Sequence, residues 1–518
     1  TLDPSVLKSR RVGRREEVCM KTALGVCLTL SLLVPTLSFG QLAFDPANPT
    51  RIFTRSFMQK SAQPLGHGLT AEEREYIENN MNEYLASKYG DATPRFRDNK
   101  TRIAPAEYEK ADGCFFAWQG YTSLLTQLVT FISETDKTYV IVDRASEIDS
   151  TKRRLENAGA NIDNVEFITK YLNSVWIRDF GPWYTYTSDG EREVIDLDYN
   201  RPRPQDDILP SYLAEKYGLP AHVLDLILPG GNLILDGHGV AIMTDVTFDP
   251  SQGGDPNLSI PQLEAFMKDY FGCHKVIILR DMNQDGTGHV DMFCKLLNDT
   301  TFIVGRYANP SDGAPGNAEI LDEAAARLES ETNGKGEPFK VFRIPMPPRR
   351  WSTTYTYTNS LICNNKVLVP VYGHSCQEEA LNIYRTLLPG YDVKGFDASG
   401  IISANGAIHC ITKLFMADPI ELSHETPEVR AGANTFEVNV DASELPHKVE
   451  LHYAPEGSDE YFTVDCLNGD KPGHYKVDVE LEAGRKVNYW FSADLDRGIK
   501  GSFPKGAKGA PLSVTVGQ

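Results

Sequence analysis

The stretch GHVDMFCKLLNDTTFIVG, residues 288–305, places a polar cluster ahead of two apolar runs that an Asn-Asp turn separates. Apolar runs of this length, bounded by turn residues, predict two neighbouring strands. A helical pattern from Ala318 to Leu328 follows the second run. The order of polar cluster, strand, turn, strand and helix describes one unit of an α/β fold.

Four other segments repeat this order of features, at residues 176–198, 230–244, 358–373 and 405–415. Internal repetition of one strand-rich unit is typical of closed, pseudo-symmetric architectures. We therefore predict a pseudo-symmetric α/β ring of five similar units over residues 101–422.

The sequence pattern changes after Pro419. Four segments, at 436–440, 449–453, 475–481 and 487–491, alternate apolar with polar residues and are separated by Gly, Pro and Asp turns. Alternation at this spacing is typical of antiparallel sheets with one buried face. We predict an immunoglobulin-like β-sandwich over residues 425–518, without catalytic residues.

The N-terminal 40 residues have the features of upstream sequence followed by a secretory signal peptide. Met20-Lys21 precedes an apolar run from Ala23 to Val34, and small residues precede Gln41, where we predict cleavage. We therefore expect a secreted, periplasmic or cell-surface protein with no membrane span in the mature chain.

Residues 41–100 form a predicted N-terminal extension with one amphipathic helix. Its start is indicated by Thr70-Ala71-Glu72-Glu73, the pattern of a capping box. We expect this helix to pack on the outside of the domain that follows.

Charge and cysteine content narrow the class of protein. A formal net charge of -19 argues against a nucleic-acid partner held by bulk electrostatics. Cleavage before Gln41 would remove Cys19 and Cys27 and leave seven of the nine cysteines, an odd number that predicts at least one free thiol. Because the cysteines lack Cys-x-x-Cys and zinc-type spacing, they indicate neither a metal knot nor a dithiol redox site.

Polar clusters of the predicted α/β ring contain the candidate catalytic residues. Asp179 follows Trp176 and Arg178, although an Arg-Asp pair can also be purely structural. His289 and Asp291 would lie on one face of a strand, an arrangement that suits proton transfer but also occurs in satisfied core pairs.

Two further clusters supply an amide and a thiol. Asn359 precedes an apolar run, and Cys410 follows His409. A cysteine with a histidine and an acid elsewhere in the chain is the pattern of a nucleophile and its base. Since neighbouring strand residues point to opposite faces, we expect His409 to face away from Cys410's partners and His289 to be the base.

The order of five short motifs resembles one known group of enzymes. W-x-R-D at 176–179, P-G-G-N at 229–232, G-H-V-D at 288–291, Y-T-N-S at 357–360 and I-H-C at 408–410 are similar to the guanidino-group-modifying, or pentein, superfamily. The chain most resembles the Porphyromonas-type peptidylarginine deiminases, with agmatine deiminases next. The resemblance covers about residues 100–518 and implies a five-bladed propeller followed by a β-sandwich.

The resemblance also implies a role for the candidate residues. Cys410 would attack the guanidinium carbon and form a covalent thiouronium intermediate. Asp179 and Asp291 would hold the guanidinium nitrogens in bidentate fashion. His289 would protonate the departing ammonia and then activate water, so the resemblance implies that no metal or other cofactor is required.

The remaining candidates concern substrate placement. Asn359 would orient the nucleophile or substrate, and Trp176 would wall the apolar part of the arginine side chain. Arg201 and Arg203, in the stretch Tyr199-Asn200-Arg201-Pro202-Arg203-Pro204, match the segment that captures a C-terminal carboxylate in the peptidyl enzymes. A solvated basic loop neutralised by neighbouring aspartates is the alternative for these two arginines.

We therefore expect an exported peptidylarginine deiminase that converts peptide arginine, preferentially C-terminal, into citrulline and ammonia. Its expected partners are arginine-containing peptides or proteins. The alternatives are an agmatine or free-arginine deiminase, and a non-catalytic surface binding protein.

Overall fold

The computed structural model describes residues 64–88 and 100–518. The predicted signal peptide, its cleavage before Gln41 and residues 41–63 lie outside the described residues. Within the described ranges, every helix is too short or too polar to cross a membrane.

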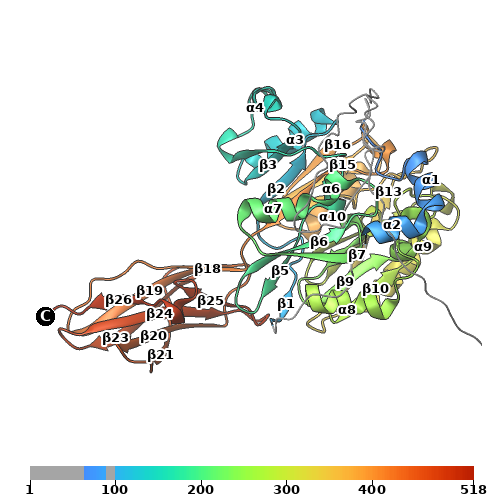
Figure 1. Cartoon of the computed structure of the whole chain (residues 1–518). Helices are drawn as coiled ribbons and strands as arrows, with labels where there is room; N and C mark the ends of the chain where they lie inside the picture. The colour runs from blue at the N-terminus through green and yellow to red at the C-terminus, as the bar shows by residue number, and fades with distance from the viewer. Residues whose placement is uncertain (1–63, 89–99) are drawn as a thin grey trace, which may run out of the picture. The chain divides into compact units, whose positions relative to one another are not determined.

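Five small sheets with one shared topology make up the domain that runs from residue 102 to 416 (Figure 1). In each sheet the first strand pairs antiparallel with the second, and the second pairs parallel with the third. The sheets are β5 (Trp183–Thr187), β6 (Arg192–Asp198) and β7 (Ala221–Ile227); β8 (Ile234–Leu235), β9 (Val240–Thr244) and β10 (Lys275–Leu279); β11 (Cys294–Asn298), β12 (Thr301–Tyr307) and β13 (Lys340–Met346); β14 (Leu361–Cys363), β15 (Lys366–Val371) and β16 (Asp392–Asp397); β17 (Lys413–Met416), β2 (Ala111–Ala117) and β3 (Thr138–Val142). Two sheets carry a fourth strand, β1 (Arg102–Ile103) beside β5 and β4 (Val165–Thr169) beside β3.

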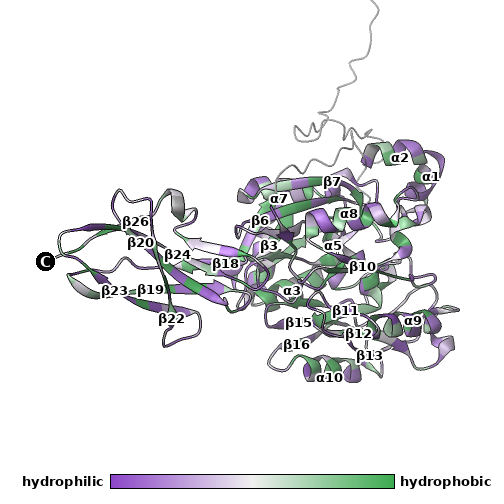
Figure 2. Ribbon diagram, turned by 90° about the horizontal axis from the view of Figure 1, so that it is seen from below, coloured by the Kyte–Doolittle hydropathy of each residue, from purple (hydrophilic) through white to green (hydrophobic). Residues whose placement is uncertain are grey.

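Helices lie in the parallel connections, because parallel strands need a crossover. They are α3 (Thr122–Ser133), α4 (Ile148–Asn157), α6 (Pro204–Asp207), α7 (Leu209–Tyr217), α8 (Ile260–Phe271), α9 (Asn317–Glu329) and α10 (Gln377–Leu387). Figure 2 shows both hydrophilic and hydrophobic residues along α9 and α10, as expected for helices with one face on a sheet.

Pairing of β17 with β2 joins the last strand of this domain to one of its first. One sheet is thus built from both ends of the domain's chain. Three of the other sheets each come from a single continuous stretch, and the sheet of β5, β6 and β7 adds the distant strand β1 at its edge. The predicted mixed α/β domain is confirmed, and its strand order repeats five times as the sequence pattern indicated.

Two antiparallel sheets follow. One contains β18 (Ile420–Ser423), β19 (Gly432–Ala442), β23 (His474–Leu481) and β22 (Leu467–Asn468); the other contains β21 (Phe462–Asp465), β20 (Lys448–Pro455), β24 (Lys486–Asp494), β25 (Lys500–Phe503) and β26 (Leu512–Thr515). Both sheets contribute to one apolar core, with Val438 and Val477 from the first and Leu451 and Phe491 from the second. A C-terminal β domain is confirmed, and its immunoglobulin-like character stays a prediction.

The described part of the N-terminal extension, residues 64–88, contains two helices rather than the single predicted one. Thr70 caps α1 (Ala71–Asn79) in a capping box with Glu73, as expected, but the helix ends at Asn80 and α2 (Met81–Lys88) follows. The apolar positions that suggested one helix are divided between the two, with Ile77 on α1 and Tyr84 on α2 buried in a shared small core.

Candidate active site

Short turns directly ahead of the first strand of each sheet carry the candidate residues. These are α5 (Ile177–Phe180), η4 (Gly230–Asn232), η7 (Val290–Met292), a bend at 357–359 and η10 (His409–Ile411). The polar clusters of the five sequence repeats are therefore turns, where the main chain presents side chains at the end of a sheet.

His289 and Asp291 do not lie on a strand, contrary to the prediction. Asp291 belongs to the 3-10 turn η7, and His289 is the residue before it. Both side chains nevertheless reach the other candidates, since His289 Nδ1 lies 3.6 Å from Asp179 Oδ1 and Asp291 Oδ2 lies 3.8 Å from Cys410 Sγ. In a turn, the curvature of the main chain can bring the side chains of residues i and i+2 together. In a strand, the same two side chains share a face because side chains alternate.

Asn359 holds the turn that carries Cys410. Its side-chain oxygen accepts hydrogen bonds from the main-chain N–H groups of Ala407 and His409, both at 3.1 Å. Its amide nitrogen lies 3.1 Å from Cys410 Sγ. One buried amide therefore fixes both the main chain around the thiol and the thiol itself.

Gly231 lies at the centre of the group. A Cβ atom at this position would lie 2.6 Å from His289 Nδ1, 2.9 Å from Asp179 Oδ1 and 3.2 Å from Asp291 Oδ2. Its main-chain N–H also donates a hydrogen bond to Asp179. The three side chains therefore converge over a main chain that tolerates no side chain.

Burial sets the protonation states of the thiol and the imidazole. Burial, followed by the negative charges of Asp291 and Asp179, raises the pKa of Cys410 well above its usual value. Burial lowers the pKa of His289 to about 4, against the opposing effect of Asp179. Near neutral pH this state of the site therefore holds a thiol and an uncharged imidazole.

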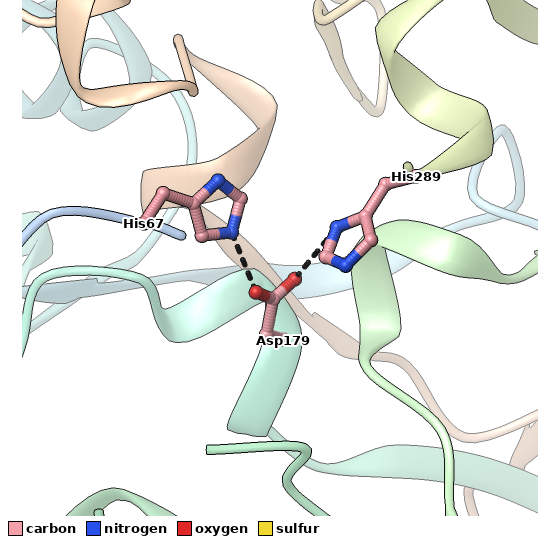
Figure 3. A group of neighbouring side chains, drawn as sticks. All are labelled: His67, Asp179 and His289. Atoms are coloured by element: carbon pink, nitrogen blue, oxygen red, sulfur yellow. Dashed lines mark hydrogen bonds and ion pairs between the residues drawn. The ribbon is translucent and has the colours of Figure 1, made fainter. Parts of the chain in front are cut away.

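A second histidine, which the sequence did not single out, contacts Asp179 from the N-terminal extension (Figure 3). His67 Nε2 lies 2.5 Å from Asp179 Oδ2, and the ring stacks on Trp176 with centroids 4.3 Å apart. Burial would raise the pKa of Asp179, but the electrostatic effect and the hydrogen bond of His67 hold it below its usual range. The one available sequence signal was a histidine flanked by glycines, Gly66 and Gly68, which permit close approach.

His67, Asp179 and His289 are of the types that bind metal ions, with ligand atoms within 4.8 Å of one another. A tetrahedral zinc ion with bonds of about 2.0–2.2 Å would hold its ligand atoms more than 3 Å apart. The 2.5 Å contact between His67 and Asp179 is instead that of a charge-assisted hydrogen bond. The geometry therefore favours a hydrogen-bonded group.

His409 faces the site, contrary to the prediction that it points away. Residue 409 lies in a 3-10 turn rather than a strand, so the alternation argument does not apply. Its ring nitrogens each lie 2.6 Å from a carboxylate oxygen, one of Asp291 and one of Glu107. Both contacts need a proton, so this buried trio shares two protons between its three members.

Glu107, also missed by the sequence reasoning, anchors the trio. It forms ion pairs with Arg178 and Lys295. Burial would raise the pKa of Glu107, but Lys295, His409 and Arg178 hold it well below its usual value. Glu107 thus fixes the far side of His409, and His409 fixes Asp291.

Arg201 and Arg203 are buried, so the alternative of a solvated loop is wrong. Arg201 Nε donates to the main-chain oxygen of His67 at 3.2 Å, and Arg203 pairs with Glu73 at 2.8 Å. Within the described residues, Nη2 of Arg201 and Nη1 of Arg203 have no hydrogen-bond partner. Each arginine therefore keeps a donor free beside the candidate site.

The described cysteines are all free thiols. Cys410 is the one among them that lies beside the converging acids and histidines, whereas Cys114, Cys294 and Cys363 are buried in the apolar core.

Comparison with known proteins agrees with the resemblance in the sequence. The family model of the Porphyromonas-type peptidyl-arginine deiminases matches residues 103–415. An agmatine deiminase of Pseudomonas savastanoi is 25% identical over 304 residues, covering 52% of this chain and 80% of its own length. A putative agmatine deiminase of Selenomonas ruminantium is 25% identical over 358 residues, which are 60% of this chain and 94% of that protein.

Solved structures share the fold. The agmatine deiminase of Enterococcus faecalis aligns with a TM-score of 0.55 at 23% identity, over 62% of this chain and 99% of that one. A putative arginine deiminase from Porphyromonas gingivalis aligns with a TM-score of 0.54 at 21% identity, over 61% of this chain and 98% of that one. The family model covers more than half of the chain, and the chain therefore belongs to the Porphyromonas-type peptidyl-arginine deiminase family, within the guanidino-modifying deiminases of the pentein superfamily.

Proposed function

We propose that this chain is an exported peptidylarginine deiminase that hydrolyses the guanidinium group of peptide arginine, preferentially at the C-terminus, to citrulline and ammonia. Within it, Cys410 is the nucleophile and His289 the acid and base. Asp179 and Asp291 bind the guanidinium, and Asn359 positions the thiol.

This proposal rests on the convergence of two carboxylates and a histidine over Gly231, with the Cys410 thiol 3.8 Å from the Asp291 carboxylate. A guanidinium is a planar cation with five N–H donors and no acceptor, so two buried carboxylates match it in charge and in hydrogen bonding. Burial and then these carboxylates raise the pKa of the thiol, and a bound cation would lower that pKa by offsetting their charge.

The chemistry balances with these groups alone. On binding of the cation, the Cys410 proton passes to His289, and the sulfur attacks Cζ to form a C–S bond. The bond from Cζ to one terminal nitrogen breaks, and that nitrogen takes the proton from His289 and leaves as ammonia. Water, deprotonated by His289, then attacks the thiouronium at Cζ, and the C–S bond breaks with its electron pair on sulfur. The thiolate takes the proton back from His289, and the product loses its C–OH proton to solvent and leaves as citrulline.

The preference for a C-terminal arginine is supported by the spacing of the two binding elements. His67 touches Asp179 with its ring and Arg201 with its own main-chain oxygen, so one residue spans both elements. A C-terminal arginine likewise offers a guanidinium and a carboxylate within one residue. The free donors of Arg201 and Arg203 could take the carboxylate in bidentate fashion.

Deimination of agmatine is the second candidate function, because several relatives bear that name. Agmatine has no carboxylate and would leave both arginines unused. The two candidates therefore differ in their dependence on Arg201 and Arg203.

Ammonia and citrulline measurements on the purified protein test the proposal. We expect product from an arginine-ending peptide, less from a peptide with internal arginine, and none after Cys410→Ala. Cys466→Ala, in the β-sandwich, serves as the matched control and should retain full activity. Absence of product with every substrate, or product that survives Cys410→Ala, would refute the mechanism.

Arg201→Gln separates the two substrates. It should reduce kcat/KM for the arginine-ending peptide by about tenfold or more, the effect of losing one charge-assisted contact, and should leave agmatine turnover unaffected. Equal losses on both substrates would argue against the carboxylate-binding role.

A further inference from the structure

Residues 64–70 of the N-terminal extension occupy the surface that the substrate would need. The segment contacts the candidate site through main chain and side chain together. Trp176 Nε1 donates to the oxygen of Leu65 at 2.8 Å, and the N–H of His67 donates to the oxygen of Ala404 at 3.0 Å. Neither Trp176 nor His67 has measurable exposure, so the segment closes over the site.

We propose that residues 64–70 act as a tethered competitor of the substrate, with the His67 ring in the place of the guanidinium and the carbonyl groups of residues 66–68 in the place of the C-terminal carboxylate. This inference rests on the proposed function for the identity of the substrate. It adds a state in which a segment of the protein itself fills the same site and so controls the access of substrate.

The hydrogen bonds of His67 show why it can replace a guanidinium. Nε2 faces the carboxylate of Asp179 at 2.5 Å, and Nδ1 faces the main-chain oxygen of Asn405 at 2.7 Å. Both partners can only accept, so both ring nitrogens donate and the ring is an imidazolium. The site thus holds a flat cation stacked on Trp176 with an interplanar angle of 15°, as it would hold the flat cation of arginine.

Carbonyl groups of the same segment occupy the arginine pair. Arg201 donates to the oxygen of His67 at 3.2 Å, and Arg203 Nη2 donates to the oxygens of Gly66 and Gly68 at 3.0 and 3.3 Å. Arg203 also pairs with Glu73, in the first turn of α1. A substrate carboxylate cannot reach these donors until the segment leaves.

The fit of the segment is tight at one glycine and loose at the other. A Cβ atom on Gly68 would lie 2.9 Å from the main-chain oxygen of Gly286, whereas a Cβ atom on Gly66 would meet nothing within 4 Å. The chain therefore contains a matched pair of positions, one whose substitution should push the segment away and one whose substitution should not.

A tethered competitor predicts a specific kinetic pattern. Because substrate binds only the fraction of molecules whose segment has left, the apparent affinity falls by that fraction, and turnover of the bound complex does not change. The full chain should therefore show a raised KM and an unaltered kcat.

The first test uses the full-length protein with His67→Ala and with the surface variant His447→Ala as control. The readout that needs no turnover is the alkylation rate of Cys410 by chloroacetamidine, a cationic reagent that resembles the guanidinium. We expect His67→Ala to raise this rate by about tenfold and to lower KM by a similar factor with kcat unchanged. An unchanged or slower alkylation, or a lower kcat, would overturn the proposal.

The glycine pair tests the segment without altering His67. Gly68→Ala should raise the alkylation rate, and Gly66→Ala should leave it at the level of the parent protein. Equal rates for both variants would contradict the proposed fit. Thermal unfolding of each variant verifies that the fold is retained.

Addition of the segment as a free peptide completes the test. The peptide PLGHGLT, residues 64–70, should slow chloroacetamidine alkylation of the His67→Ala protein, and the same peptide with alanine in place of histidine should act at least tenfold more weakly. Equal effects of the two peptides would refute the role of the ring. These outcomes do not require citrulline formation, so a failure of the proposed function and a failure of this inference can be told apart.

Discussion

The α/β domain and the C-terminal β domain bury their sheets against different kinds of side chain. From residue 420 onward, the fully buried residues among those described are apolar or aromatic, and Arg497, whose side chain is 5% exposed, is a buried charge paired with Glu109. In the α/β domain the buried set includes Asp179, Asp291, His289, Arg201 and Lys295. A charge removed from water costs several kcal/mol unless it is paired, so the two domains meet very different energetic demands.

This difference in buried charge indicates which of the two domains contains the reactive groups. The β domain gains its stability from apolar packing, which any well-patterned sheet can supply. The α/β domain keeps costly charges in a network that includes Glu107, His409 and Asp291 and that holds them beside a thiol. Changes in the charged network should therefore affect both stability and activity, and changes in the apolar core should affect stability alone.

The largest expected effect follows loss of Glu107. Glu107→Ala leaves Lys295, Arg178 and His409 without their shared carboxylate, and removal of one partner from a buried pair costs about 3–5 kcal/mol. Urea unfolding followed by tryptophan fluorescence measures this loss. Glu482→Ala, which breaks an exposed pair with Arg485 in the β domain, should cost less than about 1 kcal/mol and serves as the control. Similar small losses in both variants would contradict the contrast between the domains.

A core truncation in the β domain should separate stability from activity. Phe491 is fully buried on β24, and Phe491→Ala should destabilise its domain by about 3–5 kcal/mol through lost contacts and the cavity left behind. Turnover per folded molecule, measured below the unfolding transition, should not change. A loss of turnover without unfolding would assign the β domain a part in catalysis.

The pH dependence of stability should depend on His289. Its pKa in the folded protein is about 4, against 6.5 as the reference value. Between these pH values the unfolded chain binds a proton that the folded chain does not, so stability falls as the pH falls through this window. The loss is on the order of 3 kcal/mol and is absent above pH 6.5.

The variant His289→Asn should flatten the dependence of the unfolding free energy on pH between about 6.5 and 4. His447→Asn, an exposed position in the β domain, is the control. An unchanged slope in His289→Asn would show that His289 is protonated in the folded protein.

Much of the fold could be predicted from sequence because the period of the apolar residues and the residues that form turns are local signals. The two strands expected within residues 288–305 are β11 and β12, and the helical pattern from Ala318 to Leu328 lies within α9. The four alternating segments after Pro419 lie within β19, β20, β23 and β24. The break at Asn80 was missed because Ile77 and Tyr84 fit one helical face on either side of it.

The site was predicted in part for the same physical reason. Residues in short motifs, such as Asp179, Asp291 and Cys410, are visible in sequence, whereas the partners of His409 depend on a turn geometry that alternation rules cannot describe. His67 lies more than 100 residues from Asp179 in the chain, so its contact depends on long-range packing that no local pattern encodes.

The smallest expected effect concerns the main chain beneath the site. Gly231→Ala would place a methyl group 2.6 Å from His289 Nδ1 and 2.9 Å from Asp179 Oδ1, so these side chains must move by several tenths of an ångström. Because catalysis depends on their position, we expect kcat/KM to fall by about tenfold or more, with a change in unfolding free energy near the 1 kcal/mol typical of single substitutions. Gly400→Ala, where a Cβ atom would meet nothing within 4 Å, should leave both quantities unchanged. If Gly231→Ala lowered stability strongly but left kcat/KM intact, the three side chains would be a structural group, and the contrast between a catalytic and a purely structural buried charge would have to be drawn elsewhere in the domain.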